Sequence, residues 1–283
     1  MKFRKSLIIA FMACWTLQSD VSAMGSGGSL FTIAGTSQSQ WVSIDSETGG
    51  GTVVGPTGVD TIFGTAYDPV SNQLLGSFEN RLFEIDPETG VATVLVNLVA
   101  SPDPAQFAAV SALAFDTSTN TLFGINQGSA SGIDELITID RDSGEFQSVG
   151  VTGFRAVAGL EYDPFGDRLL AVSTDDATIL TIDRVTGAAS SPFSNGSLSV
   201  GSASLAINTA TGDAFGLNLF SGELESVDLQ TGLSTRIGPA SDTGFAGVIG
   251  LVFVPSAIPE PTPVALLGLG CLLASHRRRR SCA

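Results

Sequence analysis

Apolar and polar residues alternate over short stretches along most of the chain. Leu136-Ile137-Thr138-Ile139 and Leu180-Thr181-Ile182 are examples, and turns rich in Asp, Thr and Gly separate such stretches. A period of two residues is typical of β-strands with one buried face. No window carries a sustained helical pattern of apolar positions. The pattern therefore predicts an all-β body.

Two turn motifs recur along this body at intervals of about 45 residues. In one, an aspartate ends a strand and a glycine follows four residues later; the pairs are Asp45 and Gly49, Asp86 and Gly90, Asp140 and Gly144, Asp183 and Gly187, and Asp228 and Gly232. The other lies upstream in each unit and is opened by Asp68, Asp116, Asp163 and Asn208. Such side chains accept hydrogen bonds from amides two or three residues on, and glycine adopts the left-handed backbone conformation. We therefore expect turn formers, not a ring of catalytic or metal-binding carboxylates.

Each repeat unit reads as four short strands, named A to D in chain order, which is the composition of a β-propeller blade. The first unit lacks strand A and begins at Ser29–Ile33, whereas a lone strand with the A pattern, Gly250–Val254, follows the last unit. We predict a five-bladed propeller of four-stranded antiparallel blades over residues 24–254. The C-terminal strand joins the N-terminal blade and so removes free sheet edges. An open or sandwich-like array of hairpins is the alternative.

The repeats carry a resemblance to a known superfamily. Segments such as YDPVSNQLLG, FDTSTNTLFG and YDPFGDRLLA, each followed by an Ile-Asp turn, resemble the repeats of YVTN and WD40-like β-propellers. The resemblance covers the body of the chain. It implies the fold but no particular activity.

Residues 1–23 have the organisation of a secretory signal peptide. Lys2, Arg4 and Lys5 precede an apolar run from Leu7 to Leu17, and Val21-Ser22-Ala23 suits cleavage before Met24. The run is too short to cross a bilayer core of about 30 Å as a permanent helix. We therefore expect export through the inner membrane. Lipidation at Cys14 is a minor alternative, because Phe11-Met12-Ala13 is a poor lipobox.

Residues 255–283 form a distinct tail. Pro259-Glu260-Pro261 is followed by a short apolar segment, residues 263–275, and then by the basic cluster of Arg277, Arg278, Arg279 and Arg280. The prolines keep the motif extended, the apolar segment can enter a membrane, and the arginines stay on its cytoplasmic side. The segment is short for a full span and would need snorkelling or local thinning of the bilayer.

This order of parts resembles the PEP-CTERM sorting tail. The resemblance implies that Pro259, Glu260 and Pro261 are recognised by a membrane enzyme of the exosortase type, and that the protein reaches the envelope or an exopolysaccharide matrix. An ordinary tail anchor is the alternative.

Composition narrows the chemistry of the body. The two terminal segments contain Asp20, Glu260 and seven basic residues. The body between them contains 26 acidic residues and six arginines, which gives it a formal charge of −20. This charge repels phosphate backbones, so no nucleic-acid partner is expected. The cysteines (Cys14, Cys271, Cys282) and the single histidine, His276, all lie in the terminal segments. A body without His, Cys or Lys holds no disulfide framework and no Ser-His-Asp or Cys-His catalytic set.

A few side chains depart from the repeat. Arg155 is the only arginine in the D-to-A connections and could meet an anionic ligand at the channel mouth. The phenylalanines of these connections (Phe107, Phe154, Phe245) are expected to pack between blades. Asp134-Glu135 and Asp175-Asp176 could help to hold calcium, although no DxDxDG loop is present and we assign no metal site and no cofactor.

We therefore expect an exported, non-catalytic cell-surface or extracellular-matrix protein whose propeller is a binding or spacer module. Its partners would be the sorting enzyme, the membrane and an exopolysaccharide or another surface component. The alternative is a secreted glycan-active hydrolase that uses two carboxylates facing the channel. Glu79, Glu161 and Asp60 are the off-pattern acids that such a site could use.

Overall fold

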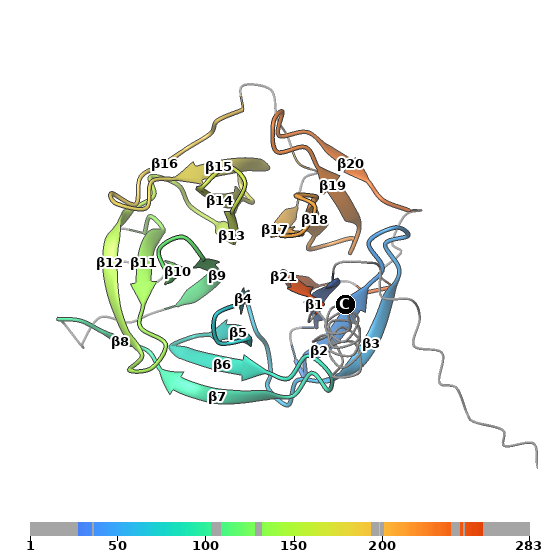
Figure 1. Cartoon of the computed structure of the whole chain (residues 1–283), viewed down its shortest axis with the longest axis horizontal. Helices are drawn as coiled ribbons and strands as arrows, with labels where there is room; N and C mark the ends of the chain where they lie inside the picture. The colour runs from blue at the N-terminus through green and yellow to red at the C-terminus, as the bar shows by residue number, and fades with distance from the viewer. Residues whose placement is uncertain are drawn as a thin grey trace, which may run out of the picture.

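The computed structural model describes residues 28–35, 37–102, 109–127, 132–193, 198, 201–238, 244–245 and 247–256. Over these residues the chain forms 21 strands in five sheets, arranged radially about a central axis (Figure 1). The five-bladed propeller predicted from the repeats is confirmed. No helix long and apolar enough to cross a membrane occurs in this part of the chain.

Strand A of each blade lies nearest the axis, and the strands of a blade pair antiparallel, apart from an extra strand in blade 3. Blade 1 consists of β21 (Val248–Pro255), β1 (Gly28–Ala34), β2 (Gln40–Ile44) and β3 (Gly51–Pro56). Blade 2 consists of β4 (Gly64–Asp68), β5 (Gln73–Phe78), β6 (Arg81–Ile85) and β7 (Ala92–Asn97). Blade 3 consists of β9 (Val110–Asp116), β10 (Thr121–Asn126), β11 (Glu135–Ile139), β12 (Glu145–Val151) and an extra strand, β8 (Val99–Ala100). Blade 4 consists of β13 (Val157–Asp163), β14 (Arg168–Ser173), β15 (Thr178–Ile182) and β16 (Ala189–Ser190), and blade 5 of β17 (Ser202–Ile207), β18 (Ala214–Asn218), β19 (Leu224–Val227) and β20 (Ser234–Arg236).

The ring closes as the sequence predicts. The last strand, β21, pairs antiparallel with β1, with Leu30 opposite Phe253, Phe31 opposite Val252 and Thr32 opposite Leu251. The innermost strands also contact one another around the ring, and β21 touches both β17 and β4. Blade 1 is therefore assembled from both ends of the described chain.

The predicted turn formers have the expected geometry. In the turn after β2, Asp45 accepts hydrogen bonds from the amides of Glu47 and Thr48 at 2.8 and 3.1 Å, and Gly49 has a φ of +78°. The four equivalent aspartates make the same pair of bonds. Backbone amides hold the pKa of these five carboxyls below its usual value. Their role as turn formers is confirmed.

The two rims of the propeller are formed by different turns and connections. The A–B and C–D turns lie on one rim, which we call the turn rim. The B–C turns and the D–A connections lie on the other, the connection rim, where they bond to each other. Thr57, for example, donates its amide hydrogen to the carbonyl oxygen of Ser39 at 2.9 Å, and Thr152 donates to Asp134 at 2.8 Å.

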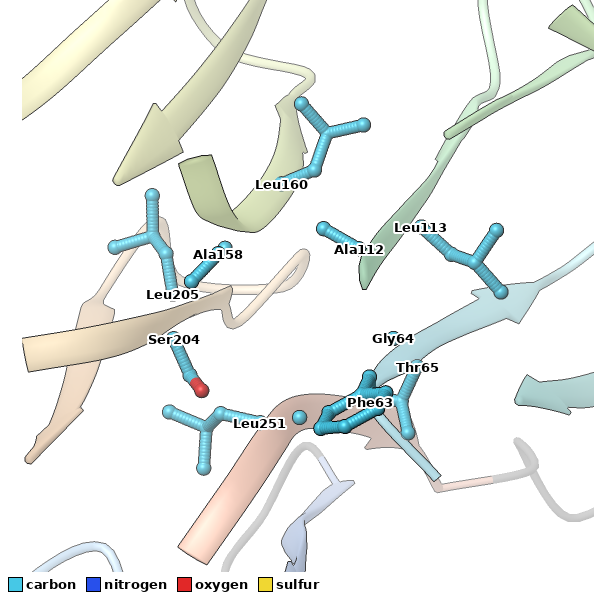
Figure 2. A pocket seen from close by; sticks show the side chains of 12 residues that line it. Phe63, Gly64, Thr65, Ala112, Leu113, Ala158, Leu160, Ser204, Leu205 and Leu251 are labelled. Carbon is cyan, nitrogen blue, oxygen red and sulfur yellow. The ribbon is translucent and has the colours of Figure 1, made fainter. Parts of the chain in front are cut away.

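The five innermost strands surround the axis, and small residues lie closest to it, whereas Leu113, Leu160 and Leu205 point away from it (Figure 2). The small residues include Gly64, Ala112, Gly159 and Ser204. The space left at this waist is about 10 Å³, which is close to the minimum for a single water molecule. Little space is therefore left between these residues at this level.

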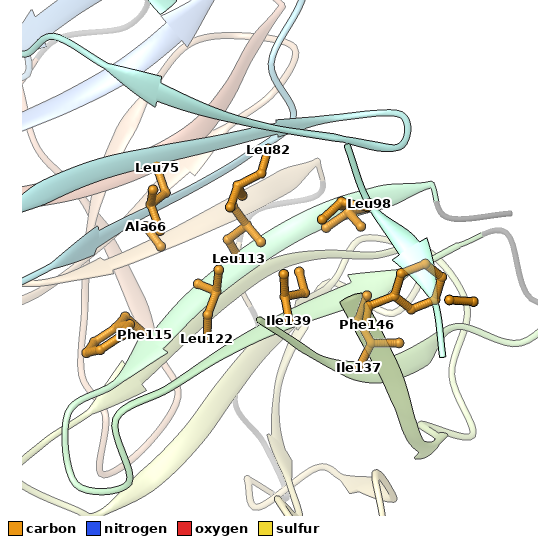
Figure 3. Packing of buried hydrophobic residues seen from close by; sticks show 12 residues of the cluster. Ala66, Leu75, Leu82, Leu98, Leu113, Phe115, Leu122, Ile137, Ile139 and Phe146 are labelled. Carbon is orange, nitrogen blue, oxygen red and sulfur yellow. The ribbon is translucent and has the colours of Figure 1, made fainter. Parts of the chain in front are cut away.

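The hydrophobic core lies between neighbouring blades. Figure 3 shows one such layer, in which Leu75 and Leu82 of blade 2 pack against Leu113 and Ile139 of blade 3. Burial of aliphatic and aromatic side chains of this kind contributes about 1.5–3 kcal/mol each. The five layers together hold the ring in place.

Blade 3 departs from the predicted four strands. Strand β8 adds to the outer edge of β12 in parallel orientation, with Val99 opposite Glu145 and Ala100 opposite Phe146. Leu98 and Ala100 are buried in the layer that Figure 3 shows. The segment after β7 therefore supplies core residues as well as an edge strand.

Candidate ligand-binding site at the turn rim

A cavity of about 170 Å³ opens on the turn rim, directly over the axis. All five innermost strands contribute to it, together with the first residues of the A–B turns. Its walls are mostly aromatic, aliphatic and proline side chains, with two threonines and a single carboxylate. The lining residues are Ala66, Tyr67, Pro69, Phe115, Thr117, Glu161, Tyr162, Pro164, Ile207, Thr209, Val252, Phe253 and Pro255.

The walls follow a rule of size. Near the turn rim, each innermost strand carries a small residue next to a large one, and the small residue packs against the large residue of the following blade. Ala66 and Phe115 belong to one hydrophobic cluster, as do Ala114 and Tyr162, Ala206 and Phe253, and Val252 and the half-buried Tyr67. Small against large fills the space between blades without overpacking.

The fifth interface breaks this rule on both sides. Glu161 stands in blade 4 where the other blades have Ala or Val, and Ile207 stands in blade 5 where they have an aromatic ring. The longer side chain therefore faces the shorter one, so that the interface keeps its volume. Packing alone would be satisfied by an apolar residue of similar length, so volume does not explain the carboxyl group.

The Glu161 carboxyl group is electrostatically isolated. Among the residues that the structure describes, none hydrogen-bonds to it and no arginine pairs with it. The nearby Asp163 is itself bonded to Arg168 at 2.8 Å, and Arg168 also donates to the carbonyl oxygen of Leu229 at 3.0 Å. Burial, followed by repulsion from Asp163, raises the pKa of Glu161 well above its usual value. The proton is therefore held on this group to a higher pH than on an ordinary glutamate.

The two tyrosines of the wall are fixed by their hydroxyl groups. Tyr67 donates to Asn72 at 2.7 Å, and Tyr162 donates to Asp167 at 2.9 Å. Since these bonds lie within the A–B turns, they position the rings and leave the cavity walls largely apolar. The tyrosine hydroxyls are therefore occupied and do not supply the missing partner of Glu161.

Arginines connect neighbouring blades on the same rim. Arg141 forms an ion pair with Asp68 of the preceding blade, and Arg184 donates to Asp116 of the preceding blade at 2.6 Å. Both carboxylates are fully buried, and the guanidinium groups lie over the rings of Phe115 and Tyr162 at 5.4 and 5.7 Å from the ring centres. The repeat pattern predicts Asp68 and Asp116 only as turn formers and does not predict these links. The available signal was the equivalent position of both arginines, each directly after a turn aspartate.

The structure separates the acids proposed for the hydrolase alternative. Asp60 lies in the connection from β3 to β4, and Glu79 lies in the turn from β5 to β6, both on the connection rim. The cavity lining over the described residues contains Glu161 and no second acid. Trp41, which could have stacked on a sugar, is buried against Phe31 with ring centres 4.9 Å apart. A two-carboxylate site around Glu161 is therefore not assembled from these residues.

The remaining sequence candidates lie on the connection rim. Arg155 is exposed there and attracts Asp134, and its binding of an anion stays a prediction. Asp134 accepts the amide hydrogen of Val157 at 2.7 Å, and burial raises its pKa. Glu135 accepts a hydrogen bond from Ser148. Within the described ranges no three His, Cys, Asp or Glu residues are grouped to hold a metal ion.

Phe154 and Phe245 pack against the layers between blades, as expected. Other predictions fall outside the described residues: the signal peptide, Phe107, the Pro259-Glu260-Pro261 motif, segment 263–275 and the basic cluster Arg277–Arg280. They remain expectations from the sequence.

No protein-family model and no curated protein matches the chain. Among solved structures, a chain of a nidogen–laminin complex is similar, with 12% identity, a TM-score of 0.52, and coverage of 80% of this chain and 98% of that one. TolB from Acinetobacter baumannii is similar with 14% identity, a TM-score of 0.50, and coverage of 81% and 67%. A protein of unknown function from Bacteroides thetaiotaomicron has 10% identity, a TM-score of 0.51, and coverage of 82% and 66%. The likeness establishes the propeller fold alone.

Proposed function

We propose that this protein is an exported cell-surface or matrix protein whose propeller is a non-catalytic binding module. The observation that carries this proposal is the turn-rim cavity, which is lined mostly by apolar side chains and holds one carboxylate. A concave, mostly apolar cavity with a few fixed polar groups suits the binding of a small ligand. Hydrolysis by a pair of carboxylates requires a second acid near the first.

The sorting part of the proposal rests on the tail sequence. The signal-like residues 1–23 direct export, and Pro259, Glu260 and Pro261 are the motif that an exosortase-type enzyme would recognise. Strand β21 ends at Pro255, on the turn rim, so the tail starts beside the mouth of the cavity. The membrane and an exopolysaccharide or another surface component complete the set of proposed partners. The strongly acidic body supports solubility outside the cell.

Fractionation of the native host tests the sorting step. Replacing Pro259, Glu260 and Pro261 together with alanine should retain the protein in the membrane fraction and deplete it from the surface and matrix fractions. Pro87 and Glu88 provide a matched control, because they form a second exposed Pro-Glu pair, in a turn of the body. Their alanine variant should be distributed like the wild type. Normal surface amounts of the tail variant would contradict the proposal.

A further inference from the structure

The cavity that opens on the turn rim combines features that specify a ligand. Its apolar part is formed by buried rings and aliphatic side chains, including Phe253 and Ile207, which are 8% and 1% exposed. Its polar part is the carboxyl group of Glu161, which has no partner among the described residues. Glu161 is half-buried, and a carboxylate that loses part of its water without gaining hydrogen-bond donors is unfavourable. A ligand that brings such donors removes this cost.

The charges around the cavity favour a cation. The arginines of the rim are already neutralised, Arg141 by Asp68 and Arg184 by Asp116 and Asp167. Arg168 is likewise bonded to Asp163. Glu161 is therefore the uncompensated group at the cavity wall, within a body of formal charge −20. An anionic ligand would face this carboxyl group and the acidic body together.

The size of the cavity limits the ligand. A volume of about 170 Å³ is below the roughly 300–1,000 Å³ of pockets that hold drug-sized molecules. The cavity opens on the turn rim, where the A–B turns contribute to its wall. The ligand therefore enters from the turn rim and has few non-hydrogen atoms.

We propose that the turn-rim cavity binds a small primary alkylammonium ion, with its N–H groups donating to the Glu161 carboxylate and its alkyl chain against the apolar wall. This inference rests on the proposed function of the propeller as a binding module and names its ligand class. A primary ammonium carries three donors, which suits the free carboxylate oxygens. The aromatic rings add a favourable environment for a cation.

Calorimetric titration of the purified chain tests the proposal, with n-butylammonium chloride as the probe and n-butanol as its neutral counterpart. Butylammonium should bind the wild type about tenfold or more tightly than butanol, and Glu161→Gln should weaken butylammonium binding by about tenfold or more. Glu225→Gln is the matched control, because Glu225 is a buried carboxylate outside the cavity that accepts a bond from Ser202 at 3.3 Å. The control variant should bind like the wild type.

A second readout compares the binding heat in buffers of different ionisation enthalpy. Because burial raises the pKa of Glu161, a cation bound beside this group should favour its ionised form and release protons, so that the measured heat should differ between the buffers. Glu161→Gln should abolish this difference. Equal binding of butanol and butylammonium, or unchanged binding by Glu161→Gln, would overturn the proposal. Surface sorting is measured independently through the tail, so either claim can fail while the other stands.

Discussion

Replacing Arg184 with alanine removes one of the inter-blade links on the turn rim. Arg184 belongs to blade 4, and it donates to Asp116 of blade 3 at 2.6 Å and to Asp167 at 2.9 Å. The Asp116 side chain is fully buried, whereas the Arg184 side chain is 24% exposed. The substitution therefore leaves a buried carboxylate without its cationic partner, while Asp116 keeps its bonds from Ser118 and Thr119.

The cost can be bounded from these contacts. Leaving a fully buried charge without its partner costs about 3–5 kcal/mol, and a single hydrogen bond to a charged group contributes about 1.5–3 kcal/mol. Because the remaining donors still stabilise Asp116 and the guanidinium is partly exposed, we expect a loss of about 2 kcal/mol. For a domain of this size, that corresponds to a decrease in Tm of about 4–8 °C.

Urea unfolding followed by circular dichroism measures this loss, and Arg236→Ala is the control. The Arg236–Glu223 pair has a similar distance, 2.9 Å, but the arginine side chain is 45% exposed, so its loss should cost about 0–1 kcal/mol. Equal effects of the two substitutions would refute the reasoning that burial of Asp116 makes the difference.

The same pair predicts a dependence on pH. Burial alone would raise the pKa of Asp116, but hydrogen bonds from Ser118, Arg184 and Thr119 together hold it below the usual 3.8. A lowered pKa in the folded state gives stability that is present above the unfolded-state pKa and is lost as the pH falls through the folded-state value. The gap in unfolding free energy between wild type and Arg184→Ala should therefore be full at neutral pH and shrink at pH values well below 3.8.

Three further predictions concern the ring, its turns and the cavity. Truncation after residue 247, which removes β21, should abolish the cooperative thermal transition. Truncation after residue 256, which keeps β21, should preserve it. A cooperative transition in the shorter chain would show that closure of the ring is dispensable. Gly144 and Gly153 both have positive φ, +75° and +81°, but a Cβ at Gly144 would meet the backbone oxygen of Asn97, whereas one at Gly153 would meet open space. Alanine should therefore cost about 1–2 kcal/mol of unfolding free energy at Gly153 and clearly more at Gly144. Urea unfolding midpoints measure these costs, and equal costs would count against the clash. Because the pKa of Glu161 is raised, its contribution to stability is full below the unfolded-state pKa and is lost as the pH rises through the folded-state value. The Tm of Glu161→Gln should therefore rise relative to that of the wild type as the pH increases above the unfolded-state pKa. Parallel profiles of Tm against pH would contradict this.

Local features of the fold could be predicted from sequence because they repeat. Alternation defines a strand, and an aspartate followed by a glycine defines its turn without reference to distant residues. The pairing of Leu251–Val254 with Leu30–Ile33 followed from counting strands, because one unit lacked a strand that the other end of the chain supplied. Strand β8 was missed because its pairing with β12 depends on contacts between blades, which the repeat does not encode.

The candidate site was predictable only in part for the same reason. Glu161 stood out as an acid off the repeat pattern. Its position beside Ile207 could not be predicted, because an apolar residue at that point of the repeat gives no sign of a special role. Only the radial arrangement brings these two positions together at the cavity, and it also places Arg184 within reach of Asp116. Comparing each residue with its counterpart in the next blade would have revealed both.

The pairing of β21 with β1 has a consequence for biosynthesis. The hydroxyl group of Thr32 bonds to the carbonyl oxygen of Ile249, a partner 217 residues later in the chain. Contacts this remote form late, so the first blade of a nascent chain stays one strand short until residue 255 has left the ribosome. A premature stop codon would remove the last strand together with Pro259-Glu260-Pro261. Any chain that still carries the sorting motif has therefore also been supplied with the strand that finishes its ring.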